Sequence, residues 1–190
     1  MLGGCAWRCL RIVSLACCGL KYCPHIIFDD KDENIANNKK INEKNKKINK
    51  KYAKFLSYEN KKTKLPKLYI KFISDDLGFG LFADQNFKKD DYVGEFCGTI
   101  TSNPDPSSDN YNYSYLDDTD IVIAPRKTGN ELQFANHSRN ANVDWKHIVG
   151  LDNKEHVIFV AIKEIKKGEQ ILIDYGDDYW NSLDKKKMDL

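Results

Sequence analysis

The sequence predicts a mostly-β domain of about 110 residues, and three observations support this prediction. Short segments rich in β-branched and aromatic residues recur between residues 68 and 175. Clusters of turn-forming residues separate them, as in "SDDLG", "NPDPSSDN", "RKTGN" and "KKGE". No segment carries a long apolar pattern with the helical period of 3.6 residues.

We expect six strands, and they follow the chain at residues 68–73, 80–83, 92–97, 120–124, 156–161 and 170–175. The domain that contains them spans residues 67–180, and a polar tail follows at 181–190. Before it lie a Cys-rich apolar segment, residues 1–28, and a linker rich in Lys and Asn, residues 29–66. The chain therefore has room for one domain and an N-terminal appendage.

The N-terminal segment holds five of the six cysteines, and Cys97 is the remaining one. A disulfide framework would distribute cysteines through the fold, so the domain is not of the disulfide-stapled class. The stretch "RIVSLACCGL" is too short to span a membrane, which takes about 20 apolar residues. A leader peptide and acylated cysteines stay open as alternatives for residues 1–28.

The linker combines many lysines with few apolar residues, as in "NNKKINEKNKKINKKYAK". Such a composition is typical of a disordered or loosely helical spacer. The alternative is a basic arm that binds an anionic partner: a nucleosome, nucleic acid or an anionic membrane.

A concentration of polar side chains stands out in "ELQFANHSRNANVD", residues 131–144. Asn136, His137 and Ser138 follow the apolar pair Phe134 and Ala135 directly, as if leaving the interior. Buried Asn, His and Ser side chains need hydrogen-bond partners. This stretch is therefore either a solvated loop or the wall of a binding site.

Four separated stretches together resemble the SET-domain family of protein lysine methyltransferases. They are "DDLGFGLFADQNFKKDDYVGEFCG", "YNYSYL", "RKTGNELQFANHSRNAN" and "KKGEQILIDYGDDYW". Each alone is a weak signal, but their order and spacing agree over roughly residues 68–180. The resemblance implies a SET-domain fold of small sheets with a C-terminal pseudoknot, in which the "NHS" and "DYG" segments pass through one another.

The resemblance also implies that the cofactor is S-adenosyl-L-methionine. Its binding residues would be Gly78, Phe79, Gly80, Phe134, Asn136, His137, Tyr175 and Trp180. The Gly-x-Gly turn would let the backbone approach the cofactor closely, and Asn136 would offer its amide to the methionine moiety. His137 would mainly hold local geometry.

For the substrate, the resemblance implies a lysine channel that ends at Tyr175, the expected catalytic residue. Tyr92 and Tyr111 would line this channel, with Tyr113 as a weaker candidate. Ile173 stands two residues before Tyr175, where the family commonly has Phe or Tyr. Tyr175 would orient the lysine nitrogen toward the transferring methyl group.

The chain departs from the family pattern at Gln133, Arg139 and Ala141, where Arg, Cys and Pro are usual. That Cys normally binds zinc with three others that follow the domain, and residues 181–190 hold no cysteine. We therefore expect no metal, and we expect Tyr179 and Trp180 to close the channel instead.

The predicted function is methyl transfer to a lysine side chain of a protein, with a histone tail as the first substrate to consider. The alternative is a catalytically weak SET fold that serves as a binding module. A third interpretation makes the basic linker the functional part. We expect a nuclear or cytoplasmic location.

Overall fold

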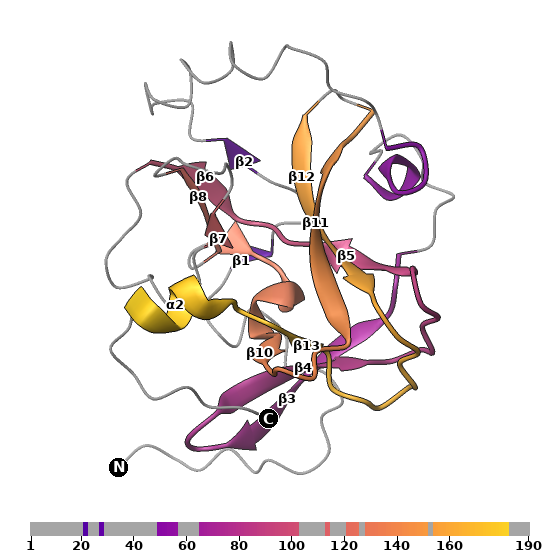
Figure 1. Ribbon diagram of the computed structural model, residues 1–190, viewed down its shortest axis with the longest axis vertical. Coiled ribbons are helices and arrows are strands. Elements are labelled where there is room, and N and C mark those ends of the chain that lie inside the picture. The colour runs from indigo at the N-terminus through magenta and orange to yellow at the C-terminus, as the bar shows by residue number, and fades with distance from the viewer. Residues whose placement is uncertain are drawn as a thin grey trace.

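The computed structural model describes residues 21–22, 27–28, 49–56, 65–102, 113–114, 121–125, 128–151 and 154–182 (Figure 1). The strands are β1 (Lys21–Tyr22), β2 (Ile27–Phe28), β3 (Leu68–Ser74), β4 (Gly78–Ala83), β5 (Tyr92–Glu95), β6 (Thr99–Thr101), β7 (Tyr113–Ser114), β8 (Val122–Ala124), β9 (Thr128–Gly129), β10 (Asn136–His137), β11 (Val143–Val149), β12 (Glu155–Ala161) and β13 (Leu172–Ile173). The helices are two 3₁₀ helices, η3 (Ala53–Phe55) and η5 (Glu131–Phe134), and α2 (Asp177–Ser182).

The predicted mostly-β class is confirmed, and each of the six predicted strands contains an observed strand or overlaps one. Five strands of the domain were not predicted: the short strands β6, β7, β9 and β10, and the long strand β11. In β11, "VDWKHIV", polar residues interrupt the apolar pattern, and only its first residue and Ile148 are buried. The short helix α2 was also missed, because six residues carry too little periodicity to be recognised.

The central sheet has the strand order β10-β13-β11-β12-β5. β11 and β12 form a long antiparallel pair, with Val143 opposite Ala161 and Val149 opposite Glu155. β13 pairs in parallel with both β10 and β11, which are consecutive in the chain. The C-terminal strand is thus inserted between two strands that the chain forms about 30 residues earlier, as the predicted crossing of the "NHS" and "DYG" segments requires.

Side-chain and main-chain hydrogen bonds fix this insertion. The main-chain N–H of Ser138 donates to the carbonyl oxygen of Ile173 at 3.0 Å. The side chain of Asn142 accepts from Leu172 N–H at 2.8 Å and donates to the carbonyl oxygen of Gln170 at 2.7 Å. Asn142 is buried, so these two bonds satisfy an amide that would otherwise destabilise the fold.

Three smaller sheets surround the central one. β3 and β4 form an antiparallel hairpin, and β6, β8 and β7 form a sheet to which β2 adds in parallel. β1 pairs in parallel with β9. Two dipeptides of the predicted N-terminal segment, 21–22 and 27–28, therefore pair with the backbone of the domain.

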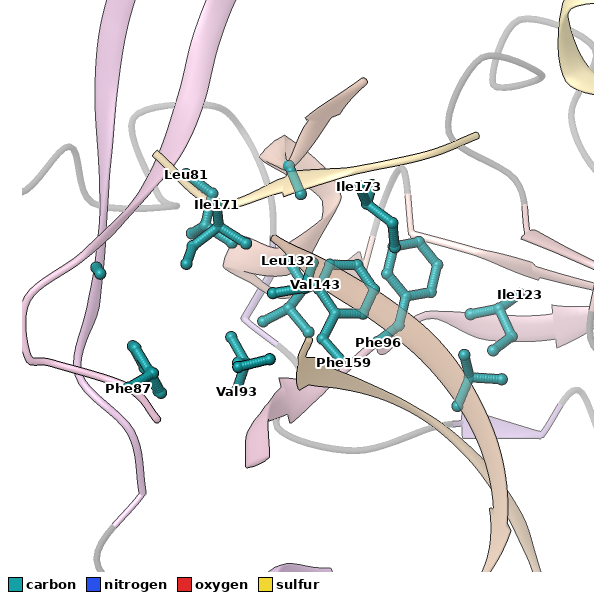
Figure 2. Packing of buried hydrophobic residues seen from close by; sticks show 14 of the residues in the cluster. Leu81, Phe87, Val93, Phe96, Ile123, Leu132, Val143, Phe159, Ile171 and Ile173 are labelled. Atoms are coloured by element: carbon teal, nitrogen blue, oxygen red, sulfur yellow. The ribbon is translucent and has the colours of Figure 1, made fainter. Parts of the chain in front are cut away.

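The main hydrophobic core lies between these sheets, and Figure 2 shows its packing. It draws one or more side chains from each of β4, β5, β8, β11, β12 and β13: Leu81, Val93, Ile123, Val143, Phe159 and Ile173. Gly94 must stay small there, because a Cβ atom would lie 2.7 Å from the side chain of Leu132. Burying this many large side chains supplies most of the stability of the domain.

The segment 49–56 corrects part of the linker prediction, because it packs against the domain instead of being solvated. Tyr52, Ala53 and Leu56 are buried, and Tyr52 and Leu56 join a second core cluster with Tyr92, Ile148, Ile158 and Val160. The ring of Phe55 stacks on Tyr92 with centroids 4.5 Å apart. Apolar residues three and four positions apart lie on the same side of a helical turn. This short turn can therefore pack against the domain, although lysines surround its apolar residues in the sequence.

The rest of the predicted linker, most of the N-terminal segment and the tail beyond Ser182 lie outside the described residues. So does Tyr111, the second predicted channel tyrosine. None of the helices in the described ranges is long and apolar enough to cross a membrane.

Candidate active site

Three segments converge beside the main core and carry most of the predicted site residues. They are the start of β4, the η5–β10 segment, and β13 with the following helix α2. The η5 turn begins at the buried Asn130, whose side chain accepts from Leu132 N–H and donates to the carbonyl oxygen of Glu95 at 2.6 Å. Gln133 extends this cap, since its amide donates to the carbonyl oxygen of Asn130 at 3.0 Å.

The Gly-x-Gly turn is joined to the "NHS" segment by Asn136. The Asn136 side-chain amide donates to the carbonyl oxygen of Phe79 at 3.2 Å. Gly78 has φ +65°, a left-handed conformation that favours glycine. At Gly80 a Cβ atom would lie 2.5 Å from Ile73 Cδ1 and 3.0 Å from Gln170 Nε2, so only glycine fits there.

Two phenylalanine rings predicted to touch the cofactor lie together. Phe79 and Phe134 make an edge contact with centroids 6.2 Å apart, and Phe134 packs against the main core. Phe79 also contacts the exposed Phe72 of β3 at 5.6 Å. The Gly-x-Gly turn therefore presents aromatic surface next to Asn136.

His137 is buried and holds the chain segment that carries Tyr175. Its Nδ1 accepts a hydrogen bond from the main-chain N–H of Tyr175 at 3.1 Å. Asp174 Oδ1 lies 3.4 Å from the same nitrogen, but this carboxylate is half exposed and accepts from Gly176 N–H at 3.0 Å. The shorter contact with Tyr175 requires a lone pair on Nδ1, so we assign neutral His137 a role in positioning.

Tyr175 is half-buried, and its hydroxyl donates to the carbonyl oxygen of Ala135 at 2.7 Å. Its ring lies 5.4 Å from that of His137. The hydroxyl proton is donated to the carbonyl oxygen of Ala135. The hydroxyl oxygen keeps its lone pairs, so it can accept a hydrogen bond from a group that approaches it.

Helix α2 covers Tyr175 and His137 with two aromatic side chains. The ring of Tyr179 contacts Tyr175 edge-on at 4.8 Å, and the ring of Trp180 contacts His137 edge-on at 5.0 Å. Trp180 is also nearly parallel to Tyr175 at 6.2 Å. The structure thus brings both residues beside Tyr175 and His137, and closure of a substrate channel by them stays a prediction.

Some buried donors at this site have no hydrogen-bond partner within the described part of the chain. Among them are the indole Nε1 of Trp180 and the side-chain Nε2 of Gln170, which lies against Gly80. A buried N–H without an acceptor costs about 1–3 kcal/mol, so each such group calls for an explanation.

Tyr92 is not brought to this site. It lies in the second core cluster, 7% exposed, where Phe55 stacks on its ring. Its neighbour Val93 belongs to the main core instead. The expected channel position of Tyr92 therefore receives no support, because its side chain points to the face that segment 49–56 covers.

Ile173 does lie next to Tyr175, but in the core: it is 1% exposed and belongs to the main cluster against which Tyr175 packs. Phe96 and Trp145, which the sequence did not single out, pack there too. Their rings are in edge contact at 5.4 Å. Strand alternation would place Phe96 on the same face as Tyr92, but β5 ends at Glu95, and this break in the alternation was not visible in the sequence.

Glu95 and His156 form a buried pair on adjacent strands, with 2.6 Å between Glu95 Oε1 and His156 Nδ1. Because the pair joins the neighbouring strands β5 and β12, we assign Glu95 a structural role. Across the described ranges, no three His, Cys, Asp or Glu side chains are grouped so that they could hold a metal ion.

Comparison with known proteins gives the family. The SET domain model matches residues 78–176, just over half of the chain. The N-lysine methyltransferase KMT5A-A of Danio rerio is 33% identical over 130 residues, which cover 62% of this chain and 37% of that protein. KMT5A of Xenopus tropicalis is 31% identical over 120 residues, covering 56% and 35%. The aligned part thus spans about a third of these relatives.

Solved structures show the same fold. The Chaetomium thermophilum polycomb repressive complex 2 matches with a TM-score of 0.55 at 24% identity, over 66% of this chain and 17% of that chain. ctPRC2 in an autoinhibited conformation bound to S-adenosylmethionine matches with a TM-score of 0.54 at 22% identity, over 63% and 17%. With the family model covering the Gly-x-Gly turn, the "NHS" segment and Tyr175, the chain belongs to the SET-domain family.

Proposed function

We propose that this protein transfers a methyl group from S-adenosyl-L-methionine to the side-chain amine of a lysine in a protein substrate. The observation that carries the proposal is the grouping of Asn136, His137, Tyr175 and Trp180 beside the Gly-x-Gly turn. These residues come from segments up to about 100 positions apart in the sequence.

The residues at the site fit the proposed cofactor. The unpartnered N–H groups of Trp180 and Gln170 are donors that a ligand with a carboxylate and an adenine ring can use. The rings of Phe79, Phe134 and Trp180 offer aromatic faces, which attract a sulfonium cation and stack on a purine. Gly80 keeps the strand free of a side chain at this point.

The cofactor, when bound, would supply an electrophilic methyl group on its sulfonium. Tyr175 then has a defined task, because its hydroxyl proton is held by the carbonyl oxygen of Ala135. The hydroxyl oxygen is left as an acceptor, so it can orient the amine of the substrate through an N–H of that amine. Orientation of two reacting groups accounts for a large part of catalysis in such reactions.

The substrate lysine must also lose its proton before it can attack, since the ammonium form has no lone pair. Apolar surroundings lower the pKa of a lysine because burial disfavours its charged form. Tyr175 packs against the main core, which supplies such surroundings. We place the substrate amine at the Tyr175 hydroxyl.

The charge of the domain favours a basic substrate. Residues 68–190 contain 14 Lys and Arg against 22 Asp and Glu, a net charge of −8. An acidic surface speeds the approach of a basic segment and favours its binding. A lysine-rich histone tail is therefore the first substrate to test.

The test is a pair of measurements on the full chain. Calorimetric titration with S-adenosyl-L-methionine should give binding to the wild type, and weaker binding to Trp180→Phe, which keeps a ring but removes the unpartnered N–H. Incubation with methyl-labelled cofactor and recombinant histones should then label lysine residues. Cofactor binding without any transfer to histones or to proteins of a cell extract would instead indicate a binding module.

A further inference from the structure

The charge of this chain is divided sharply between two regions. Residues 39–67 contain twelve lysines and two glutamates, a net charge of +10, while the domain that follows carries −8. The total of +2 conceals this division. A basic segment that is only a spacer would have no reason to be fixed on the surface, yet part of this one packs against the domain.

The anchored part, residues 49–56, has its lysines on the outside and its apolar side chains inside. Lys50, Lys51 and Lys54 are exposed, whereas Tyr52 and Leu56 are buried in the second core cluster. The ammonium groups of Lys51 and Lys54 each lie 4.9 Å from the ring centre of the following aromatic residue. The lysines are therefore held above rings that are themselves packed on the domain.

Two further lysines lie on a turn that contacts segment 49–56. The hydroxyl of Tyr52 donates to the carbonyl oxygen of Asp90 at 3.1 Å, and Lys88 and Lys89 precede Asp90 as exposed residues. Asp91 uses its carboxylate to accept from Lys88 N–H at 2.7 Å. The pKa of Lys51 is raised, first by a hydrogen bond with the Tyr52 side chain and further by Asp90 and Asp91, so Lys51 stays charged.

We propose that Lys50, Lys51, Lys54, Lys88 and Lys89 form a lysine surface that binds the phosphate backbone of double-stranded nucleic acid. These five exposed side chains come from two segments that the Tyr52 hydrogen bond links. Lysine binds phosphate as a compact point charge without requiring a particular base sequence.

The burial of the apolar residues decides between the anionic partners. A segment that binds membranes inserts apolar side chains among the lipids, but here Tyr52, Phe55 and Leu56 pack on the domain. A surface for single strands offers aromatic rings on which bases stack, and these rings are occupied as well. What is left is an array of cations, which matches a duplex, whose bases are stacked inside and whose phosphates face out.

The lysine surface is separate from the candidate active site. Figure 1 shows η3, the purple coil of segment 49–56, on the opposite side of β11 and β12 from the yellow helix α2. Binding of a duplex there leaves α2 and Tyr175 uncovered, so this inference stands independently of the proposed methyl transfer.

The test uses the full chain, a fluorescent duplex of about 20 base pairs and a salt titration, because each phosphate contact contributes about −0.9 to the slope of log affinity against log salt. We expect salt-dependent binding that the triple substitution of Lys50, Lys51 and Lys54 to Gln weakens about tenfold or more, with a slope less steep by about 2–3. Arginine at the same three positions should preserve binding. The matched control changes Lys163, Lys166 and Lys167 to Gln, which removes the same charge from another exposed turn.

Three results would overturn the proposal. If the triple variant bound the duplex within about twofold of wild type, the lysine surface would not be the binding site. An equal loss of affinity in the control would mean that only the net charge of the protein matters. Tighter binding to a single strand of equal length, or to phosphatidylserine vesicles, would assign the surface to a different partner. Unchanged melting temperatures would establish that all variants are folded.

Discussion

The side-chain amide of Asn136 donates a hydrogen bond to the main-chain carbonyl oxygen of Phe79, 3.2 Å away and 57 residues earlier in the chain. This bond fixes the distance between the Gly-x-Gly turn and the "NHS" segment. Asn136 therefore shapes the candidate cofactor site by holding its two walls together, and its amide has a second N–H for a ligand.

Asn136→Ala should weaken cofactor binding by about 1.5–3 kcal/mol, because it removes a hydrogen-bonding group next to a charged ligand and loosens the turn. The rate of transfer at saturating cofactor should change far less. Calorimetric titration of the cofactor into the folded variant measures this loss of affinity. An affinity equal to that of the wild type would mean that Asn136 is not part of the cofactor site. Asn140→Ala is the control, since Asn140 lies on an exposed turn of the same segment.

Leu56→Ala should destabilise the whole domain by about 2 kcal/mol or more, because it leaves a cavity in the second core cluster. Leu56 is 4% exposed, whereas Leu65, nine residues later, is 53% exposed. Leu65→Ala is therefore a matched control that should change stability by less than about 0.5 kcal/mol. Equal midpoints of urea denaturation for both variants would mean that segment 49–56 does not support the fold.

Glu131→Gln should stabilise the protein at neutral pH but not in acid. Burial raises the pKa of the Glu131 carboxyl, so the folded state keeps this proton to a higher pH than the unfolded state does. Stability from this group is present below the unfolded pKa and is lost as pH rises through the folded pKa. Thermal melts at pH 4 and pH 7, with the exposed Glu164→Gln as control, should show a gain for Glu131→Gln at pH 7 only.

Most of the fold could be predicted, because short β-branched runs such as "HVIFVA" identify buried strands directly. β11 could not, since Asp144, Lys146 and His147 make it read as a polar segment, and pairing with β12 and β13 overrides that local preference. The anchoring of residues 49–56 was also missed. Its apolar residues are few, and the overall composition of the linker is dominated by lysines, so composition alone does not reveal them.

The candidate site residues were predicted from motifs, and the structure brings some of them together and leaves others apart. The residues on β4, β10, β13 and α2 do meet, because the insertion of β13 between β10 and β11 brings these segments together. Tyr92 lies apart from them, in the second core cluster, because Phe55 covers its ring, and the sequence did not show that contact. Trp145 and Phe96 gave no signal beyond being aromatic residues in a β-rich chain.

The central claim rests on the hydroxyl of Tyr175, and Tyr175→Phe tests it while keeping the ring and its packing. Tyr52→Phe is the matched control: it removes another tyrosine hydroxyl that donates to a main-chain carbonyl oxygen, at Asp90, away from the site. Each substitution should cost about 1 kcal/mol of stability, so both proteins should be folded.

The most direct measurement is single-turnover methylation of a lysine substrate by the wild type and these two variants, after calorimetric titration of the cofactor. An interaction made mainly in the transition state lowers kcat and kcat/KM together when it is lost. We predict that Tyr175→Phe binds cofactor nearly as the wild type does but transfers methyl about a hundredfold more slowly, while Tyr52→Phe keeps its rate. Transfer by Tyr175→Phe within about threefold of wild type would contradict the catalytic role of Tyr175.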